Sequence, residues 1–247
     1  MIYRVRHLTR LIYAQDVTHA RFNLRLMPAN WPRQTMRNYR LIVQPNEHQR
    51  DVQSGPYWVV TTTLDFRQQL HQLDLLSEFD MELQPDPAAK PAPTMRQIRE
   101  LALATRDLSP LAPAPYLFAS RIAGLDEEIG AWAAPLMNAD ASIIDNGCAV
   151  MSAIAREFTY TSGATTSETP PIDAFRQRHG VCQDFAHIMI MALRAHAIPA
   201  AYASGYLRTI PPPGKARLVG ADAMHAWVNI WCGPELGWVG FDPTNDS

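Results

Sequence analysis

One stretch constrains the fold of this chain more than any other: a glycine, a cysteine two residues later, and then a long apolar run. Gly180 precedes Cys182, and apolar residues then recur at helical spacing, at Phe185, Ala186, Met189 and Leu193. This pattern predicts a turn that delivers the cysteine to the N-terminus of a helix with a buried face. A thiol there lies near free backbone N–H groups and the positive end of the helix dipole, which favour the thiolate. A buried structural cysteine gives the same pattern, so this stretch alone leaves both interpretations open.

The bulk composition indicates a globular protein of one large or two modest domains. The chain has 247 residues, of which 47% are hydrophobic and 19% charged. It has three cysteines, none two residues apart from another, so neither a disulfide framework nor a CxxC metal site is expected. No signal peptide stands at residues 1–6, and no apolar run approaches membrane-spanning length. We therefore expect a soluble, cytoplasmic protein that does not act at a membrane.

Charge is distributed unevenly along the chain. Residues 1–50 hold nine arginines but only Asp16 and Glu47, whereas the whole chain has a net charge of -2. The basic segment could attract the acidic remainder or an anionic partner. Because the arginines are scattered singly, we expect domain packing or solvated surface rather than nucleic-acid binding.

The first part of the chain reads as a β-rich domain over residues 1–84. Strand-like runs at 39–43, 57–66 and 79–83 follow an alternating N-terminal stretch, with breakers between them, and together predict a small antiparallel sandwich. Nothing in this part has the spacing of a nucleophile or a metal site. Its isolated histidines are interpreted as surface or core residues: His7, His19, His48 and His71.

Composition then shifts to a proline-rich linker with a helix, over residues 85–115, followed by a core domain over 116–247. Helices are predicted at 95–106, 127–137, 143–158 and from Pro171 towards Gly180, and a loop at 210–214. Cys148 is placed at an apolar-facing position of its helix, where plain packing is expected.

Two strands near the end of the chain carry the other groups that cysteine acyl-transfer chemistry needs. The alternating segment 224–231 and the segment 238–241 predict a β-hairpin that can place His225 beside Asp242. An imidazole next to Cys182 can hold the thiol proton and later protonate a leaving amine, and a carboxylate can orient the ring. A zinc site on these three side chains is the weaker interpretation, since structural zinc prefers four ligands with short local spacing.

The blocks around these three residues resemble the bacterial transglutaminase-like superfamily. They read Gly180-Val181-Cys182-Gln183-Asp184-Phe185-Ala186, then Asp222-Ala223-Met224-His225-Ala226-Trp227-Val228, then Gly237-Trp238-Val239-Gly240-Phe241-Asp242-Pro243-Thr244-Asn245. The opening residues are similar to the β-rich N-terminal domain of the same bacterial proteins: Tyr3-Arg4-Val5-Arg6-His7-Leu8-Thr9. The resemblance covers both ends of the chain, and the helical middle follows it loosely.

The resemblance implies an α+β fold. An N-terminal antiparallel β-sandwich domain would precede a papain-like, transglutaminase-type core with helices packed on an antiparallel sheet. It also implies Cys182 as nucleophile, His225 as general base and acid, and Asp242 as the residue that orients the histidine. No cofactor or metal is implied. The oxyanion hole should include the backbone N–H of Cys182, and Gln183 or Tyr160 are guesses for a second donor.

The superfamily contains amide-crosslinking enzymes, cysteine peptidases, amidases and inactive relatives, so the resemblance leaves several functions open. We expect hydrolysis of an amide or peptide bond through a thioester acyl-enzyme, because a transamidase must also exclude water and admit an amine. The alternatives are a protein-glutamine transamidase and a catalytically inactive binding or scaffold protein. The expected partner is a peptide or protein amide substrate, and a homo-oligomer stays open.

Three features depart from the usual family pattern. The family usually has glycine where Ala197 stands and often arginine where Ala201 stands. The chain stops four residues after Pro243, whereas relatives usually continue, which leaves a C-terminal truncation open.

Of the remaining histidines near the cysteine, His187 is expected to lie away from the Cys182 face of the helix. His179 is expected at the surface.

Overall fold

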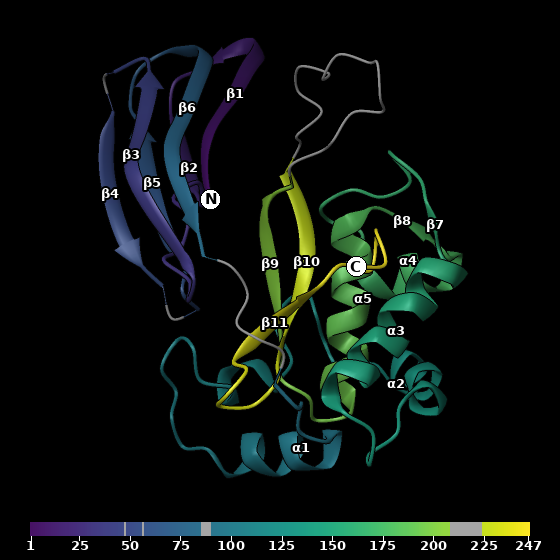
Figure 1. Cartoon of the computed structure of the whole chain (residues 1–247). Coiled ribbons are helices and arrows are strands. Elements are labelled where there is room, and N and C mark those ends of the chain that lie inside the picture. The colour runs from purple at the N-terminus through teal and green to yellow at the C-terminus, as the bar shows by residue number, and fades with distance from the viewer. Residues whose placement is uncertain (47, 56, 85–89, 208–223) are drawn as a thin grey trace, which may run out of the picture. The chain divides into compact units, whose positions relative to one another are not determined.

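The chain divides into two compact units, Met1–Ala89 and Lys90–Ser247 (Figure 1). The computed structural model describes residues 1–46, 48–55, 57–84, 90–207 and 224–247. Part of the predicted linker (85–89), the loop predicted at 210–214, and Asp222 lie outside the described residues.

The first unit is built from two antiparallel sheets of three strands each. One sheet has the order β1-β6-β3 and the other β2-β5-β4. The strands are β1 Ile2–Val17, β2 Ala20–Leu24, β3 Gln34–Gln44, β4 Gln49–Ser54, β5 Val60–Phe66 and β6 Leu70–Leu83. Side chains from both sheets form one buried cluster: Val43, Leu64, Phe66, Leu70, Leu73 and Leu75. The predicted N-terminal antiparallel β structure is confirmed.

Among the strands of this unit, β1 matches the alternating stretch of the sequence, and β4 has no counterpart in the prediction. β1 is one continuous strand, because its half-buried residues alternate with exposed ones along most of its length. β4 was not predicted because Gln49–Ser54 is polar except for Val52, so its sequence has no apolar alternation. In the structure all of its residues are exposed.

The arginines near the N-terminus pair with carboxylates of the same unit. Arg4 lies 2.9 Å from Asp80, and Arg10 lies 2.8 Å from Asp74. These pairs link β1 to β6, and residues 1–89 hold ten arginines against nine carboxylates. The positive charge of the first fifty residues is therefore nearly balanced inside the unit. Exposed ion pairs of this kind contribute little stability each.

The second unit packs helices on a three-stranded antiparallel sheet of order β11-β10-β9. Its helices are α1 Met95–Ala104, α2 Glu127–Ala133, α3 Ile143–Glu157, α4 Pro171–Gln177 and α5 Cys182–Ala195, with 3₁₀ turns η1 Ala114–Tyr116 and η2 Ala134–Leu136. Its strands are β7 Thr159–Tyr160, β8 His179–Gly180, β9 Ala200–Tyr206, β10 Met224–Trp231 and β11 Trp238–Phe241. The short strands β7 and β8 pair in parallel. None of the helices in the described residues is long and apolar enough to cross a membrane.

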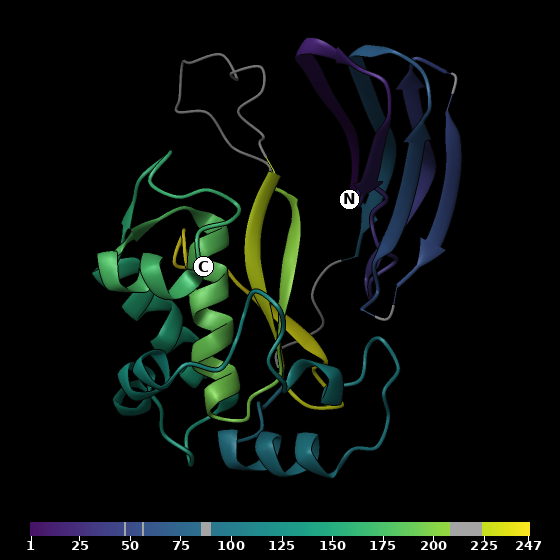
Figure 2. The ribbon, with the colours of Figure 1, turned by 180° about the vertical axis from the view of Figure 1, so that it is seen from behind.

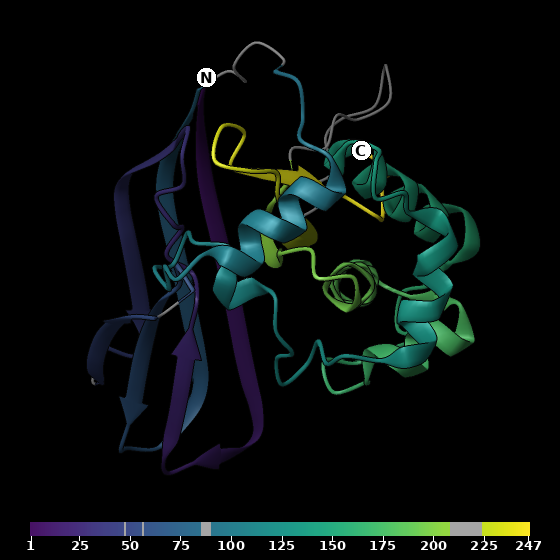
Figure 3. The same cartoon turned by 90° about the horizontal axis from the view of Figure 1, so that it is seen from below.

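Helix α5 is the centre of this unit. It contacts β9 and β10 of the sheet as well as α2, α3 and α4 (Figure 3). It begins at Cys182, and the four residues predicted to face the core are all buried, as predicted: Phe185, Ala186, Met189 and Leu193. Seen from behind, α5 again lies next to the β9–β10 pair (Figure 2). The helix is apolar around most of its circumference because it is covered on several sides.

The predicted helices are confirmed with small changes in their bounds, and the predicted burial of Cys148 is wrong. The predicted helix 127–137 divides into α2 and η2, where Pro135 has no N–H for the helical ladder. Cys148, predicted to pack against the core, is exposed. The buried side of α3 follows Ile143, Gly147 and Val150, and Cys148 lies about 100° round the helix from Gly147.

Candidate active site

Cys182 is the first residue of α5, and a buried carboxylate two residues later secures this end of the helix. The Asp184 side chain is 1% exposed. Its Oδ2 accepts a hydrogen bond from the backbone N–H of Val181 (2.8 Å) and one from Thr165 Oγ1 (2.6 Å). An acid in the first turn also complements the helix dipole. Asp184 thus fixes the backbone that presents the half-buried Cys182 thiol.

Gly180 is required because Asp184 lies directly against its backbone. A Cβ at Gly180 would lie 2.9 Å from both Cβ and Oδ2 of Asp184. The predicted turn lies earlier, at Arg178, whose φ is 57°, and Gly180 itself is in strand β8, so close approach to Asp184 is the reason for a glycine here. Beside it, Gln183 donates its side-chain amide to the carbonyl oxygen of Thr166 (3.4 Å).

His225 and Asp242 lie side by side, as the hairpin pattern predicted. The His225 Nε2 is 2.8 Å from Asp242 Oδ2, and the two side chains are only 14% and 11% exposed. In the β10–β11 register Val228 faces Phe241. One step along this register, Trp227 lies opposite Asp242. His225 is two residues before Trp227 on β10 and therefore points to the same face, as a diagonal neighbour of Asp242. With an ionised carboxylate, Nε2–H is the donor, and the Nδ1 of His225 is left for another partner.

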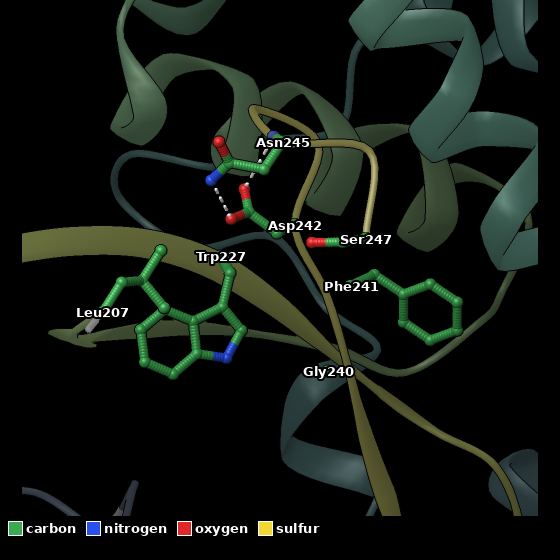
Figure 4. Close-up of a pocket in the computed structure, with 7 residues that line it drawn as sticks. All are labelled: Leu207, Trp227, Gly240, Phe241, Asp242, Asn245 and Ser247. Atoms are coloured by element: carbon green, nitrogen blue, oxygen red, sulfur yellow. Dashed lines mark hydrogen bonds between the residues drawn. The ribbon is translucent and has the colours of Figure 1, made fainter. Parts of the chain in front are cut away.

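The carboxylate of Asp242 is held by the residues that follow it (Figure 4). Its Oδ2 also accepts a hydrogen bond from Asn245 Nδ2 (2.6 Å), and its Oδ1 accepts one from the backbone N–H of Thr244 (3.0 Å). Both oxygens of the carboxylate thus accept hydrogen bonds from the turn that follows Asp242. Asp242 is therefore fixed in the orientation in which it contacts His225.

Trp227 lines a hollow of about 420 Å³ together with Asp242 and Asn245 (Figure 4). The rings of His225 and Trp227 are nearly parallel, with centroids 6.5 Å apart. A Cβ at Gly205, which faces His225 across the β9–β10 pair, would lie 2.7 Å from Trp227 Cη2. The absence of a side chain at Gly205 makes room for this indole.

The structure places Cys182 at the same end of the second unit as His225, without a hydrogen bond between them. Helix α5 packs against β10, and both elements start at that end (Figure 1). Within the described part of the chain, no hydrogen bond joins Cys182 to His225. The geometry thus shows a His–Asp pair beside the helix that begins with the cysteine.

The other two histidines near the cysteine are bonded or stacked elsewhere. His179 is exposed and its Nδ1 lies 3.1 Å from Thr161 Oγ1. His187 is half-buried and its ring stacks on that of Tyr202. Neither contacts His225 or Asp242 through a hydrogen bond in the described residues.

The other two thiols have raised pKa values. Burial raises the pKa of Cys232, which is 0% exposed, to about 12. The pKa of Cys148 is raised by partial burial and by the charges of Asp145 and Asp246. Both are therefore protonated thiols at neutral pH and poor nucleophiles. No group of three His, Cys, Asp or Glu side chains suited to a metal ion occurs among the described residues.

Sequence reasoning missed two residues that hold the site, Asp184 and Asn245. An acidic residue in the first turn of the predicted helix is a recognisable capping signal, so Asp184 could have been found. Asn245 ends one of the blocks that resemble the family, but the block gave it no role, because its hydrogen bond to Asp242 is made by a turn that only the folded chain shows.

Comparison with known proteins places the chain in a family. Its residues 130–243 match the transglutaminase-like superfamily, and residues 3–82 match the bacterial transglutaminase-like N-terminal region. The chain therefore belongs to the transglutaminase-like superfamily, and it carries the N-terminal region of the bacterial proteins.

The chain is similar to an uncharacterized protein, to part of a transferase and to a protein of known structure. An uncharacterized protein of Mycobacterium tuberculosis is 32% identical over 262 residues, which cover 99% of this chain and 79% of the relative. A protein-glutamine gamma-glutamyltransferase of Pseudomonas aeruginosa is 36% identical over 104 residues, 39% of this chain and 15% of that protein. The fold is similar to a crystal structure described as "a Putative Cysteine Protease from Cytophaga hutchinsonii", with a TM-score of 0.74 and 21% identity over 99% of this chain and 79% of the other. This likeness supports the α+β fold of both units.

Proposed function

We propose that this protein hydrolyses an amide or peptide bond through a thioester acyl-enzyme, with Cys182, His225 and Asp242 as the catalytic residues. The observation that carries the proposal is the 2.8 Å contact between His225 Nε2 and Asp242 Oδ2, beside the helix that begins with Cys182. The family membership agrees with it, because cysteine chemistry is typical of the superfamily.

In the first half of the reaction, the Cys182 thiolate attacks the carbonyl carbon and a C–S bond forms. The carbonyl electron pair moves to oxygen, where the backbone N–H of Cys182 at the helix N-terminus can stabilise the negative charge. His225, which holds the thiol proton, passes it to the amine nitrogen as the C–N bond breaks. Asp242 keeps the imidazole in the tautomer that leaves Nδ1 for this exchange.

In the second half, water attacks the thioester carbon while His225 takes its proton. The C–S bond breaks, the acid leaves, and the proton returns to the cysteine–histidine pair. If an amine attacks in place of water, the same steps give a new amide. The observation behind this alternative, transamidation, is the similarity to a protein-glutamine gamma-glutamyltransferase over 104 residues.

The test is mass spectrometry of the protein mixed with a panel of peptides, with and without an added primary amine. We expect a transient acyl adduct on Cys182 that is absent in Cys182→Ala, and a carboxylic acid as the main product. An amide of the added amine as the main product would assign the transamidase instead. No adduct with any peptide or glutamine amide, together with peptide binding that persists in Cys182→Ala, would indicate a binding protein.

A further inference from the structure

An indole lies across the sheet beside His225, and the proposed mechanism gives it no role. Trp227 is two residues after His225 on β10, so both side chains point to the same face of the sheet. The planes of their rings differ by only 18° and the centroids are 6.5 Å apart, within the range of interacting aromatic pairs. The indole is therefore the next ring along the strand from the imidazole.

Glycines on both flanking strands lie against this indole. A Cβ at Gly205 on β9 would lie 2.7 Å from Trp227 Cη2 and 3.2 Å from Cζ3, at one end of the ring system. A Cβ at Gly240 on β11 would lie 3.6 Å from Cδ1 and Nε1, at the other end (Figure 4). The indole thus spans the sheet from β9 to β11, and its six-membered ring lies over Gly205.

The six-membered ring takes the place directly across from His225. In the β9–β10 register, Gly205 is the partner of His225. Cross-strand partners have Cβ atoms about 4.5–5.5 Å apart, so a side chain at residue 205 would stand next to the imidazole. Because atoms of the indole fill that position, Trp227 borders His225 from two directions, along β10 and from β9.

Asp242 borders the imidazole from the side of β11. Its Oδ2 lies 2.8 Å from His225 Nε2, and the two side chains are only 14% and 11% exposed. If the imidazole turned away from Asp242 towards β9, it would meet the indole. Close packing of this kind leaves a side chain few orientations, and the one that remains to His225 is the one in contact with Asp242.

We propose that Trp227 is a positioning residue, whose indole holds His225 in the orientation that keeps Nε2 on Asp242 and leaves Nδ1 for proton exchange. It acts only through His225, and Gly205 is required because a side chain there would displace the indole. The inference deepens the proposed function and rests on it, because the orientation of the ring matters when His225 takes and returns the proton of Cys182.

Two readouts follow the imidazole and the thiol separately. The Nε2–H proton of His225 gives an NMR signal in water while it is hydrogen-bonded and protected from exchange, and His225→Gln identifies that signal by removing it. The second readout is the rate constant for alkylation of Cys182 by iodoacetamide at about pH 6, measured by peptide mass spectrometry. Cys232 is 0% exposed, so its protection from alkylation without denaturant shows in every variant that the unit is folded.

We expect Trp227→Ala to remove the Nε2–H signal and to slow the alkylation of Cys182 about three- to tenfold, the range of one lost aromatic contact. Trp227→Phe keeps a ring beside His225 and should keep the signal and a rate within about twofold. The matched control is Trp231→Ala, which removes an indole from the same face of β10 about 20 Å further along the strand. It should leave both readouts as in wild type.

A single methyl group at Gly205 gives the sharpest comparison. Gly205→Ala should reproduce the losses of Trp227→Ala, because its Cβ collides with Cη2 of the indole. In the Trp227→Phe background the same methyl group should be harmless, since phenylalanine lacks the Cη2 and Cζ3 atoms that it meets. Gly124→Ala, where an added Cβ has nothing within 4 Å, is the control for the glycine change.

The failure of this inference and the failure of the proposed function give different results. Wild-type signals and rates in both Trp227→Ala and Gly205→Ala, with Cys182 still alkylated at least about tenfold faster than Cys148, would overturn the role of Trp227 alone. A loss from Gly205→Ala that is equal in the wild-type and Trp227→Phe backgrounds would also overturn it, because the methyl group would then act without the indole. Alkylation of wild-type Cys182 no faster than that of Cys148 would overturn the proposed function itself.

Discussion

Adding one methyl group at Gly180 should disrupt the N-terminus of α5. The Cβ of Gly180→Ala would lie 2.9 Å from Asp184 Oδ2, closer than such atoms approach in proteins. Asp184 is 1% exposed and cannot turn outward without losing its hydrogen bonds from Val181 and Thr165. Hydrogen bonds to a charged group contribute about 1.5–3 kcal/mol each, so weakening two of them should cost about 2–4 kcal/mol of unfolding free energy.

The assay follows the second unit alone, because two units can unfold separately. Cys232 is fully buried in that unit, so its alkylation as a function of urea concentration reports when the unit unfolds. The control is Gly124→Ala, where an added Cβ has nothing within 4 Å, and it should change the unfolding free energy by about 0.5 kcal/mol or less.

A double-mutant cycle shows whether the collision with Asp184 is the cause. In an Asp184→Gly background, the added methyl group meets neither the Cβ nor the carboxylate of residue 184, so the cost of Gly180→Ala should largely disappear. The reasoning is refuted if Gly180→Ala is as harmless as Gly124→Ala. It is also refuted if the cost of Gly180→Ala is the same with and without the Asp184 side chain.

Two further changes test other parts of the structure. Asp242→Asn should lower kcat by about a hundredfold or more with KM within about threefold, since the amide presents a donor where His225 and Asn245 both donate; a change in KM alone would contradict this. Ala197 has a φ of 56°, the left-handed conformation that glycine adopts without strain, so Ala197→Gly should raise the unfolding free energy by up to about 1 kcal/mol in urea denaturation; destabilisation would show that the strain is not significant.

Much of the second unit could be predicted because its local signals agree with its tertiary structure. The strands at 224–231 and 238–241 have strong β patterns and a turn between them, and they form β10 and β11 with those bounds. The start of α5 at Cys182 followed from the glycine and the apolar spacing. Ala197, noted as a departure from the family's glycine, does occupy a conformation that favours glycine.

The rest could not be predicted because it depends on contacts between distant residues. The reach of β1 depends on its antiparallel pairing with β6, some seventy residues away, which runs from Ile2 opposite Glu82 to Ile12 opposite Gln72. Cys148 looked apolar-facing because a helix pattern gives the period of a face, while its neighbours in space decide which side is covered. Asn245 and Thr165 acquire their roles only when the chain brings them to Asp242 and Asp184.

The measurement that tests the central claim most directly is the alkylation of the three cysteines by iodoacetamide at about pH 6, resolved by peptide mass spectrometry. Because the pKa of Cys232 is raised to about 12 and that of Cys148 is also raised, both should react slowly at this pH. The account predicts that Cys182 reacts at least about tenfold faster than either, and that His225→Ala removes most of this advantage. Equal labelling of Cys182 and Cys148, or a rate at Cys182 that does not depend on His225, would contradict it.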